Sequence, residues 1–340
     1  MSTTGTTFTA MVMREAGAAP APESRPIPEP GHGEALVRLK ATSLNYHDLV
    51  NLSGVIRGGP WPRVPMSDGT GEVVAIGPGV TSIAVGQRVN LPFSPSWLRG
   101  GPSAEPRREV LGDTCDGCLQ QYRCIAANAL SVVPEHLSWA ESATLPCAGV
   151  TAWSSLRAGA LEPGDVVLTQ GTGGVSLLAV QLAKANGATV IATSSSDQKL
   201  EVAKALGADH VINYRSSPEW HVATREITGG RGADIVIDVG GAGTMAKSIR
   251  ATAMGGTIAI VGGLDGFSTE IALSQVLMQQ IRLVGIAVGS VADQRDLCRS
   301  VTAAEIRPHI SHTFEWDQLA EATRVQRANE HIGKIALLIP

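Results

Sequence analysis

The residues with the clearest chemical purpose are the glycines of a short turn, Gly171-Thr-Gly173-Gly174. They follow an apolar run at 166–170 and precede a periodic apolar segment from Val175, which predicts a buried parallel strand, a tight turn and a helix. Such a turn suits a dinucleotide pyrophosphate, because no side chain blocks the phosphates and the helix offers free N–H groups. Ser176 stands where a third glycine is usual, and an ordinary strand-to-helix turn is the structural alternative.

The segments that follow support the nucleotide interpretation. A second strand is expected at 189–193, a helix at 197–206, and a third strand at 207–214. Together with the glycine turn they form a βαβαβ pattern, which is half of a nucleotide-binding fold.

The end of the second strand favours NADP(H) over NAD(H). NAD-binding folds usually place Asp or Glu there to hold the ribose 2′-hydroxyl, whereas this strand ends in serines. Asp197 argues against this preference, although it also complements the helix dipole, and Ser195 with Gln198 fits a capping box. The side chains that suit a 2′-phosphate are Ser194, Ser195, Lys199 and Tyr214.

Length and composition point to a two-domain cytoplasmic enzyme. The chain has 340 residues, of which 44% are hydrophobic and 17% charged. A net charge of −4 gives no electrostatic basis for binding nucleic acid or an anionic membrane. The N-terminus lacks the features of a signal peptide, and no apolar run approaches the ~18 residues of a membrane span. Five sparse cysteines favour a reducing compartment.

The spacing of strands and helices divides the chain into two domains. Short strands and turns dominate 8–135, whereas helices alternate with apolar strands from about 140, and six strands can be counted from Val166. The tail after about 290 has no place in that sheet, so we expect it to return to the first domain. The expected domains are 139–289 for nucleotide binding, and 1–138 with 290–340 for catalysis.

Several segments together resemble the medium-chain dehydrogenase/reductase superfamily over nearly the whole chain. The resemblance implies an α/β protein: a Rossmann domain with a doubly wound, six-stranded parallel sheet, and a GroES-like, mostly β catalytic domain. It also implies a homodimer or homotetramer. The segments that carry it are Ser43–Leu49, Pro65–Val73, Gly86–Val89, Leu145–Trp153, the turn at Gly171, Ala203–Asp209 and Gly333-Lys334.

The chain departs from the zinc-binding branch of this superfamily. That branch has a cysteine where this chain has Asn45, a His-Glu pair at Ser67-Asp68, and a Cys or Asp at the position that Cys147 matches. Catalytic zinc normally needs three protein ligands, and Zn²⁺ favours thiolate and imidazole over amide or hydroxyl. We therefore expect no zinc, and Cys147 becomes a small buried residue beside the substrate pocket.

Three clustered cysteines could suggest a different metal site. Cys115 and Cys118 are followed by Cys124, which resembles part of a structural zinc lobe. A closed zinc site needs four ligands, and no histidine lies within ten residues. A disulfide or redox pair is possible between the first two, but isolated thiols are the expectation for a cytoplasmic protein.

Without a Lewis acid, the substrate must be activated by hydrogen bonding. Quinones and α,β-unsaturated carbonyls suit this better than alcohols, whose oxidation at neutral pH normally needs zinc or an activated base. The zinc-lacking branch resembles quinone oxidoreductases and enoyl reductases. The sequence therefore predicts an NADP(H)-dependent oxidoreductase that transfers a hydride to a small carbonyl or quinone substrate.

The resemblance places Asn45 beside nicotinamide and substrate, and His47 at a proton-relay position, with Tyr46 as another possible donor. Alternatively, Asn45 and Asp48 cap a short helix and His47 is only a surface residue. Phe93 and Trp97 line the substrate pocket or simply pack.

The remaining cofactor contacts follow from the fold, because ligands bind at the carboxyl ends of parallel strands. The resemblance also suggests that Asp238 lies near the adenosine or ribose. The expected cofactor-binding residues are Thr151, Gly171, Thr172, Gly173, Gly174, Val175, Ser194, Ser195, Lys199, Tyr214, Val239, Gly240, Gly262, Gly263, Leu264, Ile286, Ala287, Val288 and Lys334.

Two other functions remain open. The first is an alcohol dehydrogenase or ketoreductase of the same superfamily. The second is a protein that binds the cofactor without turnover, as lens crystallins of this superfamily do.

Overall fold

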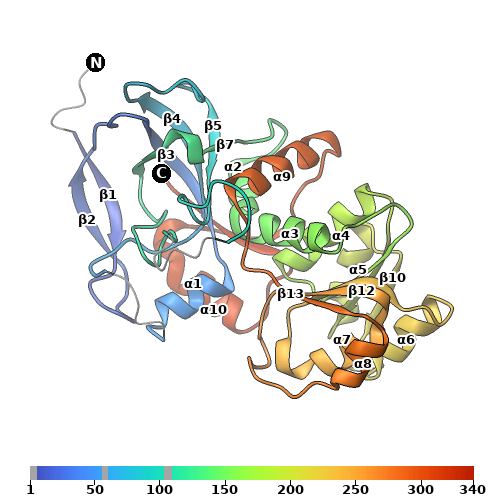
Figure 1. Cartoon of the computed structure of the whole chain (residues 1–340). Helices are drawn as coiled ribbons and strands as arrows, with labels where there is room; N and C mark the ends of the chain where they lie inside the picture. The colour runs from blue at the N-terminus through green and yellow to red at the C-terminus, as the bar shows by residue number, and fades with distance from the viewer. Residues whose placement is uncertain (1–5, 56–59, 103–108) are drawn as a thin grey trace. The chain divides into compact units, whose positions relative to one another are not determined.

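The computed structural model describes residues 6–55, 60–102 and 109–340. By contacts it divides into two compact units, Met1–Val150 with Gly289–Pro340, and Thr151–Val288 (Figure 1). The domain boundaries expected at 138 and 290 stay predictions.

A seven-stranded sheet organises the first unit. Its order is β14-β15-β3-β4-β5-β7, with β6 also pairing with β3. The long strand β3 lies between three partners, which explains why its side chains are buried along most of its length. The strands are β3 (Glu34–Ser43), β4 (Gly69–Ile76), β5 (Arg88–Leu91), β6 (Tyr122–Ala126), β7 (Ser131–Val132), β14 (Ile310–Glu315) and β15 (Lys334–Leu338), beside a separate hairpin of β1 (Thr7–Val12) and β2 (Ala21–Pro26).

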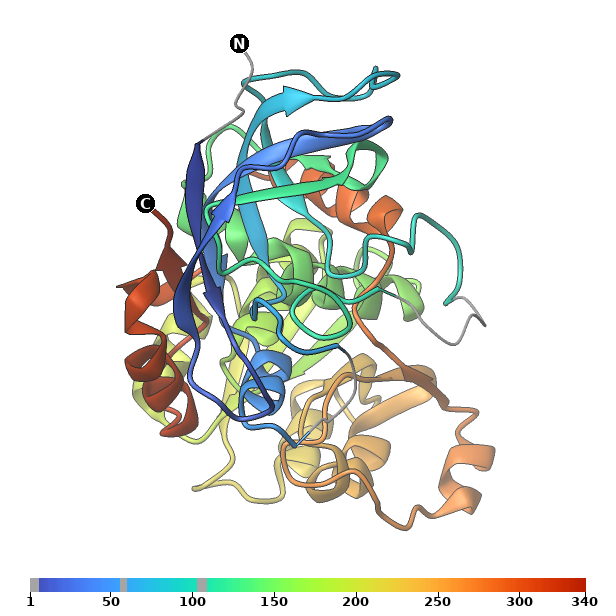
Figure 2. The same cartoon turned by 90° about the vertical axis from the view of Figure 1, so that its left-hand side faces the viewer.

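The C-terminal segment supplies an inner strand of this sheet. β15 pairs antiparallel with β3, so that Ala336 lies opposite Ser43, and α10 packs on β14 and β15 (Figure 2). The end of the chain is thereby held beside residues about 290 positions earlier in sequence. The helices of this unit are α1 (Tyr46–Leu52), α2 (Trp139–Ala143), the π-helix η2 (Leu145–Gly149), α9 (Val291–Ala303) and α10 (Leu319–Arg327), with the 3-10 turns η1 (Ala127–Ala129) and η4 (Trp316–Gln318).

A six-stranded parallel sheet organises the second unit and confirms the expected doubly wound Rossmann fold. Its order, β10-β9-β8-β11-β12-β13, reverses direction between β8 and β11. Ligands bind at such a reversal in doubly wound folds. The strands are β8 (Val166–Gln170), β9 (Thr189–Ser194), β10 (His210–Asn213), β11 (Ala233–Asp238), β12 (Thr252–Ile260) and β13 (Arg282–Gly285).

The helices of this unit connect the strands as the apolar periodicity predicts. The third strand is shorter than expected, at His210–Asn213 rather than 207–214, because Gly207 has a φ of +112° and still belongs to the turn that leaves α5. No helix of the described residues is long and apolar enough to cross a membrane. The helices are α3 (Val150–Ala158), α4 (Gly174–Ala185), α5 (Asp197–Ala205), α6 (Trp220–Ile227), α7 (Met245–Ala251) and α8 (Leu273–Met278), with the 3-10 turn η3 (Gly241–Gly243).

Candidate active site

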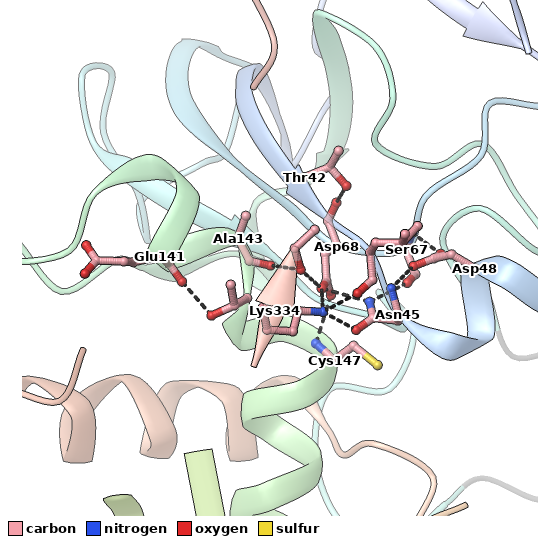
Figure 3. Close-up of polar contacts among 12 residues, drawn as sticks. Thr42, Asn45, Asp48, Ser67, Asp68, Glu141, Ala143, Cys147 and Lys334 are labelled. Carbon is pink, nitrogen blue, oxygen red and sulfur yellow. Dashed lines mark hydrogen bonds and ion pairs between the residues drawn. The ribbon is translucent and has the colours of Figure 1, made fainter. Parts of the chain in front are cut away.

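The buried carboxylate of Asp68 is the centre of the candidate site in the first unit (Figure 3). One oxygen accepts hydrogen bonds from the Ser43 hydroxyl at 2.5 Å and the Asn45 amide at 2.8 Å, and lies 3.5 Å from the Lys334 ammonium. The other oxygen accepts the backbone N–H of Cys147 at 2.9 Å. Burial raises the pKa of Asp68 above its ordinary value, and the ammonium of Lys334 opposes this shift.

Lys334 is directed into this cluster from the start of β15. Its side chain is 4% exposed, and its ammonium donates to the carbonyl of Leu44 at 2.8 Å and to Oδ1 of Asn45 at 2.5 Å. With the Asp68 carboxylate as a third neighbour, the ammonium is surrounded by oxygen atoms of its own unit (Figure 3). Its expected contact with a cofactor stays a prediction.

Asn45 connects the members of the cluster. Its Nδ2 donates to Asp68 and, at 3.2 Å, to the hydroxyl of Ser67, while its Oδ1 accepts from Lys334. Both polar atoms of this amide therefore have protein partners, and its expected role beside the substrate stays a prediction.

Asp48 fixes the start of α1. Its carboxylate accepts the N–H of Asn45 at 2.9 Å and the N–H of Ser67 at 2.8 Å. The helix begins at Tyr46, and Asn45 with Asp48 forms its capping box, as the structural alternative proposed. This cap also ties the helix to the turn that carries Asp68.

His47 and Phe93 are brought together beside this cluster. Their rings meet edge to face with centroids 5.1 Å apart, and Nε2 of His47 lies 2.8 Å from Nδ2 of Asn51. Tyr46 is 51% exposed, so it faces solvent more than its neighbour does. The indole of Trp97 donates to the carbonyl of Gly100 at 2.9 Å, within its own loop.

The donors at the superfamily's metal position do not suit Zn²⁺. The Asn45 oxygen and the Asp68 carboxylate already surround an ammonium. Burial, reinforced by the Asp68 carboxylate, raises the pKa of the Cys147 thiol well above its usual range, whereas zinc binds thiolate. Among the described residues no group of three His, Cys, Asp or Glu side chains could hold a metal ion.

The other cysteines form no bridge. Cys115, Cys118 and Cys124 are free thiols, and burial raises the pKa of each, that of Cys124 to about 11.

The glycine turn of the second unit fits a dinucleotide pyrophosphate. Gly171 has a φ of +73°, and Gly173 is the N-cap of α4. A Cβ built on either residue would meet no atom within 4 Å, so the turn borders open space where a ligand can approach the backbone. The hydroxyl of Ser176 donates to the carbonyl of Gln170 at 2.6 Å, which gives the third position of the motif a structural purpose.

The predicted 2′-phosphate residues lie at neighbouring strand ends. The hydroxyls of Ser194 and Thr172 are 3.5 Å apart, and the N–H of Tyr214 donates to the carbonyl of Ser194 at 3.0 Å. Burial lowers the pKa of Lys199 on α5. Asp197, the residue that argues against NADP, accepts the amide of Asn213 at 2.7 Å.

Two details at these strand ends differ from expectation. The N-cap of α5 is Ser196, so the capping box of Ser195 with Gln198 was wrong. Arg215 was not among the expected cofactor residues, and its backbone N–H donates to Oδ1 of Asn213 at 3.0 Å. A basic residue directly after Tyr214 was the available signal.

Asp238 organises the loop after β11 from inside the unit. Its oxygens accept from the N–H of Gly241, the hydroxyls of Thr244 and Ser248, and the amide of Gln170, at 2.5–3.2 Å. The carboxylate is fully buried and has these four protein partners, so it is occupied structurally rather than presented to a ribose.

The loops after β11 and β12 are packed against each other. The N–H of Leu264 donates to the carbonyl of Val239 at 3.2 Å. A Cβ on Gly262 would come within 2.9 Å of the Val239 carbonyl oxygen, and one on Gly263 within 2.8 Å of the Gly266 carbonyl oxygen. Glycine at 262 and 263 is therefore required by the protein itself, and their contacts with a cofactor stay predictions.

The remaining expected cofactor residues are spread along the sequence of the second unit. Thr151 is buried on α3, and its carbonyl accepts the hydroxyl of Ser155 at 2.7 Å. The N–H of Ile286 donates to the carbonyl of Ile260 at 2.9 Å, which continues the β12–β13 pairing. Val288 has a φ of +61°, a conformation that β-branched residues rarely adopt. Val175 in α4, Gly240 and Ala287 complete the set.

Two protein-family models match the chain. A GroES-like domain of alcohol dehydrogenases matches residues 31–135, and a zinc-binding dehydrogenase domain matches 174–303.

Whole-chain relatives and structures agree with these models. A zinc-type alcohol dehydrogenase-like protein of Schizosaccharomyces pombe is 42% identical over 94% of each chain, and a crotonyl-CoA reductase of Streptomyces avermitilis is 29% identical over 92% of this chain and 80% of its own. The structure of a putative alcohol dehydrogenase from Sinorhizobium meliloti superposes with a TM-score of 0.92 at 36% identity and full coverage of both chains. A crotonyl-CoA carboxylase/reductase in complex with NADP superposes with a TM-score of 0.86 at 25% identity, over 98% of this chain and 94% of its own.

Gly173→Ala should fold normally yet weaken cofactor binding, because the new methyl group occupies the space that the pyrophosphate needs. We expect the Kd for NADPH to rise about tenfold or more, equivalent to ~1.4 kcal/mol. Titration with the cofactor, followed by fluorescence or calorimetry, measures the Kd. The melting temperature shows whether the variant folds normally. Gly101→Ala, also with no atom near the added Cβ, is the matched control. Unchanged affinity in Gly173→Ala would remove this turn from the cofactor site.

Proposed function

The chain belongs to the medium-chain dehydrogenase/reductase superfamily of NAD(P)-dependent oxidoreductases, and we propose that it is a zinc-independent, NADP(H)-dependent reductase of quinones or α,β-unsaturated carbonyls. The observation that carries the proposal is the ammonium of Lys334, held by Asn45 and Asp68 at the position where zinc-binding members have their ligands. The cluster is a closed set of hydrogen bonds rather than an array of metal donors.

Activated acceptors fit a site of this kind. Reduction of a polarised C=C bond or a quinone needs a positioned hydride and a hydrogen-bond donor, whereas alcohol oxidation also needs a strong base or a Lewis acid. The similarity to a crotonyl-CoA reductase supports an enoyl-type acceptor.

The residues of each unit have separate roles in this proposal. When bound, NADPH supplies a hydride from the nicotinamide to the β-carbon or the quinone ring. The glycine turn from Gly171 to Gly174 holds the pyrophosphate. In the first unit, Phe93 provides an apolar wall, and His47 donates a hydrogen bond or a proton to the oxygen on which negative charge develops.

NADP(H) is the proposed cofactor, because hydroxyl-bearing residues lie at the ends of β9 and β10 and basic residues are close to them in sequence. Ser194, Lys199, Tyr214 and Arg215 are suited to a 2′-phosphate, and Asp197 is engaged with Asn213. The NADP complex of the crotonyl-CoA carboxylase/reductase, whose fold is similar, supports this choice.

An alcohol dehydrogenase or ketoreductase activity is the second candidate. The names of the S. pombe and S. meliloti relatives favour it. Oxidation of a simple secondary alcohol with NADP⁺, compared with reduction of an enone, separates the two activities.

A homodimer is the proposed assembly, built on the edge of the six-stranded sheet. β13 is the last strand of that sheet, so its outer N–H and C=O groups form an open edge that can pair antiparallel with a two-fold-related copy. Apolar side chains around this edge and on α8, which is orange in Figure 2, are at least 71% exposed: Met254, Phe267, Leu273, Leu277 and Met278. A second copy would bury this surface, and two such pairs would give a tetramer.

Leu277→Lys should weaken the assembly, because it places a charge in the proposed apolar interface. Light scattering should give at least twice the 35.3 kDa chain mass for the wild type and a shift toward the monomer for the variant. Val222→Lys, on α6, adds the same charge at another exposed apolar residue and is the control. A wild-type monomer at micromolar concentration would contradict this assembly.

The purified protein should carry no stoichiometric zinc, because its donor set is occupied by Lys334 and its one cysteine there is held as a thiol. Elemental analysis after dialysis is the measurement, and turnover of an enone should survive treatment with a strong chelator. About one zinc per chain, lost together with activity on chelation, would overturn zinc independence.

Lys199→Ala should narrow the preference for NADPH over NADH. We expect a change of ~1–3 kcal/mol in the difference between the two binding free energies, the range of a charge-assisted hydrogen bond. Lys204→Ala is the control, because Lys204 lies on the same helix and pairs with Glu201 at 2.7 Å. Equal affinity of the wild-type protein for both cofactors would refute the NADP assignment.

His47→Ala should lower turnover much more than it weakens NADPH binding. General acid–base groups contribute about 10²–10⁴-fold, so an enone at saturating NADPH should be reduced at least about 10²-fold more slowly. A quinone should be affected less, because water can protonate its reduced product. Wild-type rates with both substrates would remove His47 from the reaction.

A further inference from the structure

The side chain of Asn51 makes a short polar contact with the ring of His47. Both residues lie on α1 at positions i and i+4, where side chains of a helix face each other. Nδ2 of Asn51 is 2.8 Å from Nε2 of His47. An amide nitrogen only donates, so Nε2 must accept, and a neutral imidazole that accepts through Nε2 carries its hydrogen on Nδ1.

The Asn51 side chain is buried, whereas the ring it contacts is partly exposed. It is 3% exposed, whereas the imidazole of His47 is 25% exposed and packs edge-on against Phe93. Within the described residues, Nδ1 of His47 has no hydrogen-bond partner, so this nitrogen remains available as a donor.

Oδ1 of Asn51 is an unusual feature of this contact. It is a buried polar atom without a hydrogen-bond partner in the part of the chain that the structure describes. An unsatisfied buried acceptor destabilises the fold, so its presence calls for a compensating purpose. A half-turn of the amide would present Oδ1 to Nε2, which is what a protonated imidazole requires.

A carboxylate also lies near Nε2 of His47. Oδ2 of Asp113 is 3.8 Å from Nε2 of His47, and Oδ1 of Asp113 is 3.8 Å from the buried guanidinium of Arg63. The other carboxylate nearby on α1, that of Asp48, already accepts two backbone N–H groups. Asp113 is therefore the charge that faces an imidazolium at His47, and Arg63 counterbalances it.

We propose that Asn51 is a positioning residue that holds neutral His47 as the Nδ1–H tautomer and offers Oδ1 as the acceptor when Nε2 is protonated. The role in turnover rests on the proposed function: a neutral Nδ1–H can donate to a carbonyl oxygen on which charge develops, as neutral imidazoles do in other enzymes. The tautomer itself follows from the geometry of α1 and does not depend on the substrate.

The tautomer is measured by long-range ¹H–¹⁵N correlation on protein labelled in histidine. The signal of His47 is assigned by its loss in His47→Ala, and the other seven histidines are internal references. At a pH where the ring is neutral, we expect the Nδ1–H pattern for His47 of the wild type. An Nε2–H pattern there would overturn the proposal without any variant.

Asn51→Asp provides the reverse arrangement, because a carboxylate of the same shape can only accept. We expect its His47 signal to change to a form protonated at Nε2. With an enone at saturating NADPH, kcat should fall about 10²-fold while the KM for NADPH changes little. Asn128→Asp, which makes the same substitution in the turn Ala127–Ala129 of the first unit, should change neither the spectrum nor kcat.

If Asn51→Asp does not fold because its new carboxylate is buried, Asn51→Leu provides a second test. This variant removes the donor and the unsatisfied oxygen together, so it should fold and show Nε2–H signal that the wild type lacks. An unchanged Nδ1–H pattern in Asn51→Leu would overturn the proposal. A shifted tautomer with wild-type kcat would instead refute the role of His47 in the proposed function.

Discussion

A carboxylate with no exposure to water must be balanced within the protein, and this constraint at Asp68 shapes the first unit. Its oxygens are reached from β3 by Ser43, from the start of α1 by Asn45, from η2 by Cys147 and from β15 by Lys334. Removing one partner of a buried pair leaves an uncompensated charge and costs about 3–5 kcal/mol. The four chain segments are therefore fixed relative to one another by one side chain.

The second unit also contains a fully buried carboxylate, but this one fixes a loop at the strand ends. Asp238, also fully buried, is held by hydroxyl, amide and backbone donors, without a cation. Its partners tie the end of β8 to the loop after β11, and the hydroxyl of Ser176 adds a link between α4 and β8. Loops rich in glycine are usually mobile, and these contacts keep them at the strand ends where a ligand must be held.

The sequence predicted what depends on local pattern. The order of strands, the glycine turn and the start of α4 follow from apolar periodicity and from turn residues, and the structure confirms them.

The Asp68–Lys334 contact could not be predicted in this way, because 266 positions separate the two residues and neither has a local partner that reveals the other. The same holds for the contact of His47 with Phe93, since only the fold brings α1 and the loop after β5 together. Ser196 rather than Ser195 caps α5 because the serines are chemically equivalent and only the backbone distinguishes them.

The return of the chain to complete the first sheet has a consequence for synthesis on the ribosome. Lys334 is translated 266 residues after Asp68, when the second unit has already been made. Until then the segments around Asp68 have emerged without their cation, and the carboxylate must stay hydrated or protonated. The part of the first unit around Asp68 therefore cannot reach its final form until the second unit and β15 have been translated.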